Sequence, residues 1–93
     1  MMIEYEWDEE KATQNWTKHG VGFDEAIEVF GDPNAAEFLD EVHSSNETRM
    51  ICIGYSTKRI LFVVFVERDA NIVRLISARE PTPTERDLYE GNN

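Results

Sequence analysis

The chain has 93 residues and a formal net charge of −10, and its length suits one domain with a single hydrophobic core. Hydrophobic residues make up 41% of the sequence and charged residues 30%, a balance that excludes a disordered chain. The single cysteine excludes a disulfide framework, and no apolar run reaches the roughly 20 residues of a membrane helix. The start shows no signal-peptide pattern, so we expect a cytoplasmic protein in which residues 1–93 form one domain.

The N-terminal segment predicts a strand followed by a helix. Residues 3–7 alternate apolar and acidic side chains, as a short half-buried strand does. Asp8 is a suitable N-cap for a helix that runs to about Lys18, and Gly20 is a suitable stop. Helical spacing predicts two groups of side chains on shared faces: Ala12 with Trp16 on the inner face, and Lys11 with Asn15 and Lys18.

The rest of the chain predicts a second helix, four strands and a last helix. Residues 23–30 place apolar side chains at helical spacing, and residues 31–33 end that helix. We expect strands at about 35–39, 48–55, 59–67 and 72–78. The connections between the last three strands are short, which favours an antiparallel meander. Thr82 and Glu85 form a capping box for a helix that ends near Glu90.

The element order is therefore β-α-α-β-β-β-β-α. Helices and strands are segregated along the chain, which predicts an α+β fold with an antiparallel sheet. We expect the helices to pack mainly on one face of this sheet. The other face is then partly open and available for binding.

The charge is distributed unevenly along the sequence. Residues 1–47 hold thirteen acidic and two basic side chains, whereas residues 48–93 hold seven basic and six acidic ones. Six of those seven basic residues are arginines, whose planar fork of donors suits phosphate. The alternative is an acidic protein whose arginines pair with nearby Glu and Asp side chains.

The motifs of metal and cofactor chemistry are missing from the sequence. It has no Gly-rich phosphate loop, no nucleophile elbow and no pair of histidines at metal spacing, so we expect neither a metal nor a cofactor. Cys52 lies within a strand pattern and is expected to be a small buried side chain. The remaining candidates are basic side chains near the ends of helices and strands.

Each of these basic candidates also has a structural explanation. Lys18 and His19 close the first helix, where the helix dipole favours cations. Arg74 interrupts an apolar strand, so a buried ion pair and an anion site are equally open. Side chains alternate along a regular strand, so Arg74 and Arg79 face the same way only if a bulge or the strand end reorients one. Tyr89 either joins a site or docks the last helix.

Such a set of side chains suits RNA cleavage by internal transesterification. In that reaction the RNA 2′-hydroxyl attacks the adjacent phosphate, and no metal is required. The protein aligns the chain, moves two protons and stabilises the crowded phosphate. Arginine and lysine serve the last role, and histidine, lysine or tyrosine serves the proton transfers.

The sequence resembles the BrnT family of toxins from bacterial type II toxin–antitoxin pairs over nearly its whole length. The residues that carry the resemblance are Tyr5-Glu6-Trp7-Asp8, Lys11, Asn15, Lys18-His19-Gly20-Val21, Phe23, Glu25-Ala26, Asp32-Pro33, Arg49, Gly54, Glu67-Arg68, Arg74-Leu75-Ile76-Ser77-Ala78-Arg79, Glu85-Arg86 and Tyr89. Each piece is short, but their order and spacing together are specific.

The resemblance implies a RelE-like toxin, a metal-independent endoribonuclease that arrests translation. It also implies a BrnA-like ribbon-helix-helix antitoxin that neutralises the toxin and binds operator DNA together with it. The site candidates carried over are Lys18, His19, Arg68, Arg74, Arg79 and Tyr89.

The roles implied for these candidates differ. Arg74 and Arg79 would bind the phosphate, and Arg68 would position the substrate. Lys18 or His19 would transfer a proton, with Tyr89 as a weaker alternative. The acidic composition keeps open a non-catalytic binding module that acts with the antitoxin on the operator. An acidic structural adaptor is a third reading, independent of the resemblance.

Overall fold

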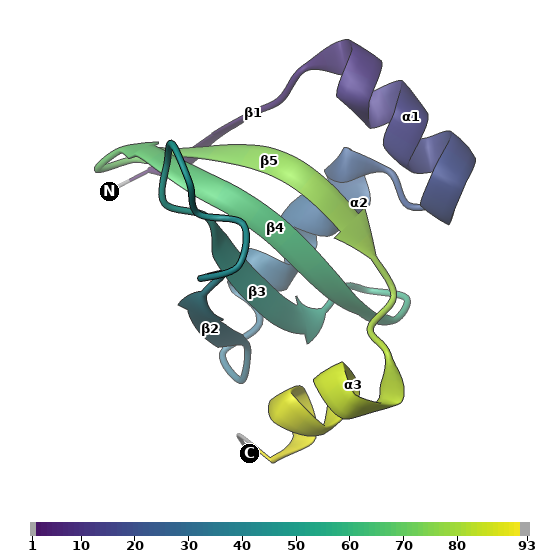
Figure 1. The fold of residues 1–93 in the computed structure, drawn as a ribbon. Helices are drawn as coiled ribbons and strands as arrows, with labels where there is room; N and C mark the ends of the chain where they lie inside the picture. The colour runs from purple at the N-terminus through teal and green to yellow at the C-terminus, as the bar shows by residue number, and fades with distance from the viewer. Residues whose placement is uncertain (1, 92–93) are drawn as a thin grey trace.

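The computed structural model describes residues 2–91, and its element order is the predicted one (Figure 1). The elements are β1 (Glu4–Glu6), α1 (Glu9–His19), α2 (Phe23–Ala26), the 3₁₀ helix η1 (Ile27–Gly31), β2 (Ala36–Leu39), β3 (Met50–Tyr55), β4 (Ile60–Asp69), β5 (Ile72–Arg79) and α3 (Pro83–Glu90). The second predicted helix is thus a short α-helix that continues as a 3₁₀ turn.

The five strands form one sheet in the order β1-β5-β4-β3-β2. Strands β3 to β5 are the expected antiparallel meander, and β2 extends it by pairing antiparallel to β3. β1 differs, because it pairs parallel to β5, with Glu4 opposite Ile72 and Glu6 opposite Arg74. No hairpin links β1 to its neighbour; the two are far apart in sequence, so their relative direction is not set by a tight turn.

The two faces of the sheet carry separate hydrophobic clusters. On the first, here called the helix-covered face, Val21, Phe23 and Val29 pack with Leu61 and Phe65. α1, α2 and η1 belong to this face, which agrees with the expected packing of helices mainly on one side. The second, the open face, is covered by α3 at one end only (Figure 1).

Helix α3 is the exception to one-sided packing. Its Tyr89 is buried against Ile53, Ile60 and Phe62 on the open face. α3 therefore shields the end of the open face next to β3, and the loop between β2 and β3 lies in front of β4 and β5 (Figure 1).

The ends of α1 form as the sequence predicts, and of the two residues expected on its inner face Ala12 packs against the core but Trp16 does not. Asp8 accepts hydrogen bonds from the backbone N–H groups of Glu10 and Lys11, and Gly20 closes the helix with φ 68°. Trp16, expected on the inner face, is 62% exposed, whereas Asn15 is buried. The prediction for Trp16 was wrong because α1 lies beside β5 rather than across the sheet, so only a narrow stripe is covered (Figure 1).

Gly54 lets η1 approach β3 closely. A Cβ atom at this position would lie 3.0 Å from the Val29 carbonyl oxygen and 3.2 Å from Ala35 Cβ. We expect Gly54→Ala to lower the free energy of unfolding by about 1–3 kcal/mol, because η1 must move away from the sheet. Urea denaturation measures this loss. Gly31→Ala is the matched control, because a Cβ there meets nothing within 4 Å; an equal loss in both variants would contradict the prediction.

Candidate active site

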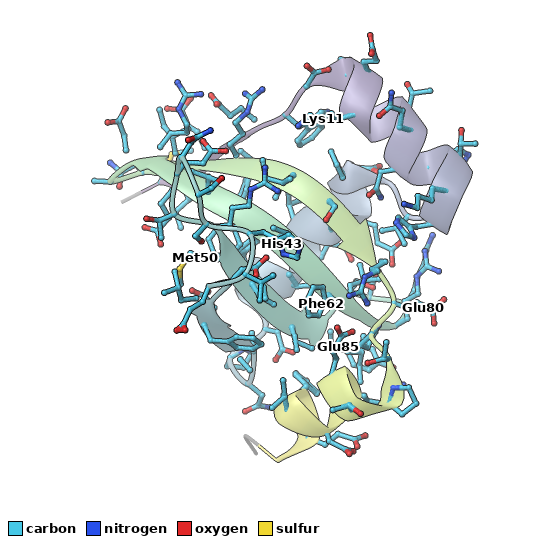
Figure 2. The ribbon with its side chains drawn as sticks, viewed as in Figure 1. Lys11, His43, Met50, Phe62, Glu80 and Glu85 are labelled. Carbon is cyan, nitrogen blue, oxygen red and sulfur yellow. The ribbon has the colours of Figure 1, made fainter. Side chains whose placement is uncertain are left out.

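A groove with a volume of about 420 Å³ lies on the open face of the sheet. Its apolar floor is formed by Ile51, Phe62 and Val64. Its other lining residues are mostly charged or polar: Asp40, Val42, His43, Arg49, Ser77, Arg79 and Glu85. Figure 2 shows His43, Phe62 and Glu85 on this same side of the molecule. The groove therefore combines a flat apolar base with two guanidinium groups and an imidazole.

A β-bulge in β5 decides which side chains face this groove. Ser77 pairs with Val64, but Leu75 pairs with Phe65, so Ile76 is an extra residue on β5. The extra residue reverses the alternation of side chains beyond it. Partners in the register share a face, so Arg74, opposite Val66, and Arg79, opposite Phe62, both lie on the open face. The sequence analysis allowed Arg74 and Arg79 to face the same way only through a bulge or through the strand end. The structure contains the bulge.

Arg79 is held at the edge of the groove by Glu85. Its two Nη atoms donate to the two Glu85 carboxylate oxygens at 2.7 and 2.9 Å, and its guanidinium carbon lies 4.2 Å from the centre of the Phe62 ring. The same carboxylate accepts from the Thr82 backbone N–H in the capping box of α3. The Arg79 hydrogen bonds are the main reason that the pKa of Glu85 falls to about 2.

The Arg79–Glu85 pair predicts a loss of stability in acid. The pKa of Glu85 is lowered by folding, so the pair contributes fully above the ordinary value of 4.5 and is lost as the pH falls toward about 2. We expect Glu85→Gln to remove about 1–2 kcal/mol of unfolding free energy at pH 7 and progressively less below pH 4.5. Urea denaturation from pH 7 to pH 2.5 measures it.

The matched control for this pH series is Glu90→Gln, on the exposed side of the same helix. Folding also lowers the pKa of Glu25, through hydrogen bonds from Arg59 and then Ser56, so the wild-type curve contains more than one contribution. The difference between wild type and Glu85→Gln isolates one of them. If the difference in unfolding free energy between wild type and Glu85→Gln stayed constant down to pH 2.5, the pKa of Glu85 would not be lowered by Arg79 as described.

Arg74 and Arg68 lie outside the groove and share one carboxylate. Their Nη1 atoms lie 3.1 and 3.2 Å from the same oxygen of Glu6 on β1. The sequence left two alternatives for Arg74, a buried ion pair and an anion site. The structure contains an ion pair, and the Arg74 side chain in it is only partly buried. Two guanidinium groups around one carboxylate leave one positive charge in excess among these three side chains.

Lys18 and His19 line a second pocket of about 260 Å³ between α1 and β5. Ser77 lines this pocket and the groove, so the two hollows adjoin at the β5 edge. Burial lowers the pKa of His19, and the positive charges of Lys18 and Arg79 lower it further. Lys11 also lines this pocket, and within residues 2–91 neither lysine has an ion-pair partner.

Asn15 attaches α1 to the edge of β5. Its Oδ1 accepts from the Ala78 backbone N–H at 3.0 Å, and its Nδ2 donates to the carbonyl oxygens of Ala78 at 2.8 Å and Val21 at 2.9 Å. The side chain therefore imitates a neighbouring strand where the short β1 has ended. This contact places Lys18 and His19 beside the groove.

Tyr89 is directed away from the groove. Its hydroxyl donates to Asp32 at 2.8 Å, and this hydrogen bond, followed by burial, raises the pKa of Tyr89 to about 12. Its ring packs in the open-face cluster. The structure thus brings Lys18, His19 and Arg79 together, places Arg74 and Arg68 further along β5, and uses Tyr89 to dock α3.

Three groove residues were absent from the sequence-based site candidates. Glu85 was expected as a helix cap and as part of the family resemblance, Arg49 only as part of that resemblance, and His43 was not singled out. His43 lies near Asp40, with Nδ1 3.1 and 3.2 Å from the two carboxylate oxygens. The loop has no periodic pattern, so the only sequence signal was the spacing of Asp40 and His43, three residues apart.

Among the described residues, metal-binding side chains form no cluster that could hold a metal ion, and the thiol of Cys52 is buried. Among residues 2–91, no group of three or more His, Cys, Asp or Glu side chains is placed to hold a metal ion. Burial raises the pKa of the Cys52 thiol to about 12, so it is not a nucleophile. No helix in this part of the chain is long and apolar enough to cross a membrane.

Comparisons with known proteins identify the family and the fold. A family model described as "Ribonuclease toxin, BrnT, of type II toxin-antitoxin system" matches residues 7–85. The fold is similar to the crystal structure of the Brucella abortus ribonuclease toxin BrnT, with a TM-score of 0.67 and 24% sequence identity. The match covers 87% of this chain and 99% of that one. No curated protein sequence matches the chain.

Proposed function

The chain belongs to the BrnT family of ribonuclease toxins of type II toxin–antitoxin systems, and from this premise we propose that it cleaves RNA by metal-independent transesterification. The observation that carries the proposal is the groove on the open face, where Arg79 and Arg49 flank an apolar floor. The pocket of Lys18 and His19 adjoins this groove at Ser77. Side chains that are able to bind phosphate thus lie next to side chains that are able to transfer a proton.

The proposed roles follow from the charges along β5. Arg79 binds the scissile phosphate and stabilises the charge that builds up on it in the transition state. Arg74 binds phosphate further along the same face, and Arg68 positions the chain beside it. Lys18 or His19 transfers a proton at the adjoining pocket. Tyr89 is the weaker candidate for this step because its hydroxyl already donates to Asp32.

We also propose the partners of such a toxin. RNA cleavage would arrest translation in the cytoplasm, and a BrnA-like ribbon-helix-helix antitoxin would neutralise the toxin and join it on operator DNA. The acidic first half of the chain supports a basic partner, because complementary charge accelerates association.

The proposed activity is tested first by growth after tightly controlled expression of this chain. We expect arrest, relief of arrest by co-expression of a BrnA-like antitoxin, and relief by Arg74→Ala. The Arg74→Ala protein must be as abundant and as folded as wild type. Arrest that persists undiminished in Arg74→Ala would contradict the role of Arg74.

A second candidate function is a non-catalytic module that acts through antitoxin and operator binding. Two observations favour it: the net charge of −10, and the Glu85 carboxylate that already occupies Arg79. This function predicts no growth arrest by the chain alone, with the protein present at normal abundance and bound tightly to the antitoxin. Failure to bind the antitoxin would exclude it.

A further inference from the structure

We propose that His43 is the general base of the cleavage reaction and that Asp40 is its positioning residue. This inference rests on the RNA cleavage proposed above. It adds to that function a residue that the sequence did not suggest, on a loop that lies over the open face (Figure 2).

The loop between β2 and β3 is closed by hydrogen bonds at its base. The Asp40 N–H donates to the Arg49 carbonyl oxygen at 2.8 Å, and the Arg49 N–H donates to Ser44 Oγ at 2.9 Å. The His43 N–H points back to the Asp40 carboxylate at 3.3 Å. The loop thus has a defined shape that brings His43 and Arg49 to the same groove.

The imidazole of His43 is oriented by a carboxylate that is itself buried. The Asp40 side chain is 10% exposed and that of His43 is 66% exposed. A carboxylate only accepts hydrogen bonds, so His43 Nδ1 carries the hydrogen that lies between them. In the neutral imidazole, Nε2 then holds a lone pair on the opposite side of the ring, where no described residue bonds to it. An imidazole held in this way is suited to accept a proton.

The surroundings of His43 match the needs of the reaction. Arg79 and Arg49 line the same groove and suit the negative charge of a phosphate, and the apolar floor at Phe62 offers a surface for the nucleoside. Lys18 stands on the other side of Ser77, in the adjoining pocket. Its ammonium has protons to donate and no lone pair, so it complements a base and does not replace one.

The proposed step is balanced in protons and bonds. The RNA 2′-oxygen gives its proton to Nε2 of His43 and forms a bond to phosphorus. The bond between phosphorus and the 5′-oxygen breaks, and that oxygen takes a proton from the Lys18 ammonium. The products are a 2′,3′-cyclic phosphate and a 5′-hydroxyl. Arg79 faces the phosphate while five oxygens surround the phosphorus atom.

The test begins with a labelled single-stranded RNA that contains a site cut by the wild-type protein. We expect His43→Ala to lower the single-turnover rate at least about 100-fold, as loss of a general base does. Ser45→Ala, an exposed change in the same loop, is the control. Equal rates for His43→Ala and wild type would overturn the inference and leave the proposed function intact. An inactive wild type would overturn both.

A modified substrate separates the base from the acid. Sulfur in place of the bridging 5′-oxygen leaves without a proton, so it restores cleavage to a variant that lacks the acid but not to one that lacks the base. We expect the sulfur substrate to rescue Lys18→Ala and to leave His43→Ala impaired. Added imidazole should restore part of the His43→Ala activity. Rescue of His43→Ala by sulfur would show that His43 is the acid, which overturns the assignment.

The role of Asp40 is tested through its dependence on His43. Asp40→Asn keeps an acceptor for the His43 N–H but removes the negative charge. We expect this variant to lose about tenfold in rate with KM unchanged, and we expect no further loss when His43→Ala is already present. If Asp40 only supports the fold, the two losses in rate multiply in the double variant. Such a result would exclude Asp40 as a positioning residue.

Discussion

Replacing Arg79 with alanine should lower the rate of RNA cleavage by about 10²- to 10³-fold and relieve growth arrest. The expected size is that of removing one donor from a preorganised anion-stabilising site. Two effects act together here. The phosphate loses the guanidinium fork, and the Glu85 carboxylate, left without its partner, repels the substrate. Single-turnover cleavage of a labelled RNA measures the loss.

Two further variants separate these effects. Arg79→Ala combined with Glu85→Gln removes the repulsion, so any activity regained over Arg79→Ala alone measures it. Arg86→Ala is the matched control, because Arg86 lies on the exposed side of α3 and pairs only with Glu90 among the described residues. If folded Arg79→Ala protein still cleaved RNA at a rate within threefold of wild type, Arg79 would not be the residue that binds the scissile phosphate.

Replacing Asn15 with alanine should lower the free energy of unfolding by about 2–4 kcal/mol. The change removes the hydrogen-bond partner of the Ala78 N–H and the donor to the carbonyl oxygens of Ala78 and Val21. A buried polar group left without a partner costs about 1–3 kcal/mol, and water reaches some of these groups when the side chain is shortened. Urea denaturation at pH 7 measures the loss.

The control for this variant is its exposed neighbour on α1, Gln14→Ala, which should change the unfolding free energy by less than about 0.5 kcal/mol. We also expect Asn15→Asp to be at least as destabilising as Asn15→Ala, because a carboxylate would face two carbonyl oxygens. If Asn15→Ala were as stable as Gln14→Ala, α1 would be held to β5 by packing alone.

The element order could be predicted because its signals are local. Asp8, Gly20 and the capping box at Thr82 each involve only a few neighbouring residues, and all three operate in the structure as expected. The face of the sheet that α3 covers could not be predicted in this way. It depends on the contact between Tyr89 and strand residues that are distant in sequence.

The candidate site was only partly predictable for the same reason. Helical spacing shows that Asn15 and Lys18 share a face, but it does not show which face of α1 meets the sheet, and Trp16 was misplaced on that account. The bulge at Ile76 arises from the pairing of β5 with β4. His43 reaches the groove because of contacts that close its loop, and these leave no periodic trace in the sequence.

Because of the bulge at Ile76, the faces on which the β5 side chains lie depend on the number of residues in the strand. Arg74 and Arg79 are five residues apart, so a regular strand would put them on opposite faces, and the extra residue brings them to the same face. Deleting Ile76 would leave Ser77 opposite Val64 and Arg79 opposite Phe62, so both would keep the open face without a bulge. Pairing the unshortened strand without a bulge would instead turn Arg79 toward the helices. The site on this strand is therefore encoded by a count of residues as well as by their identity.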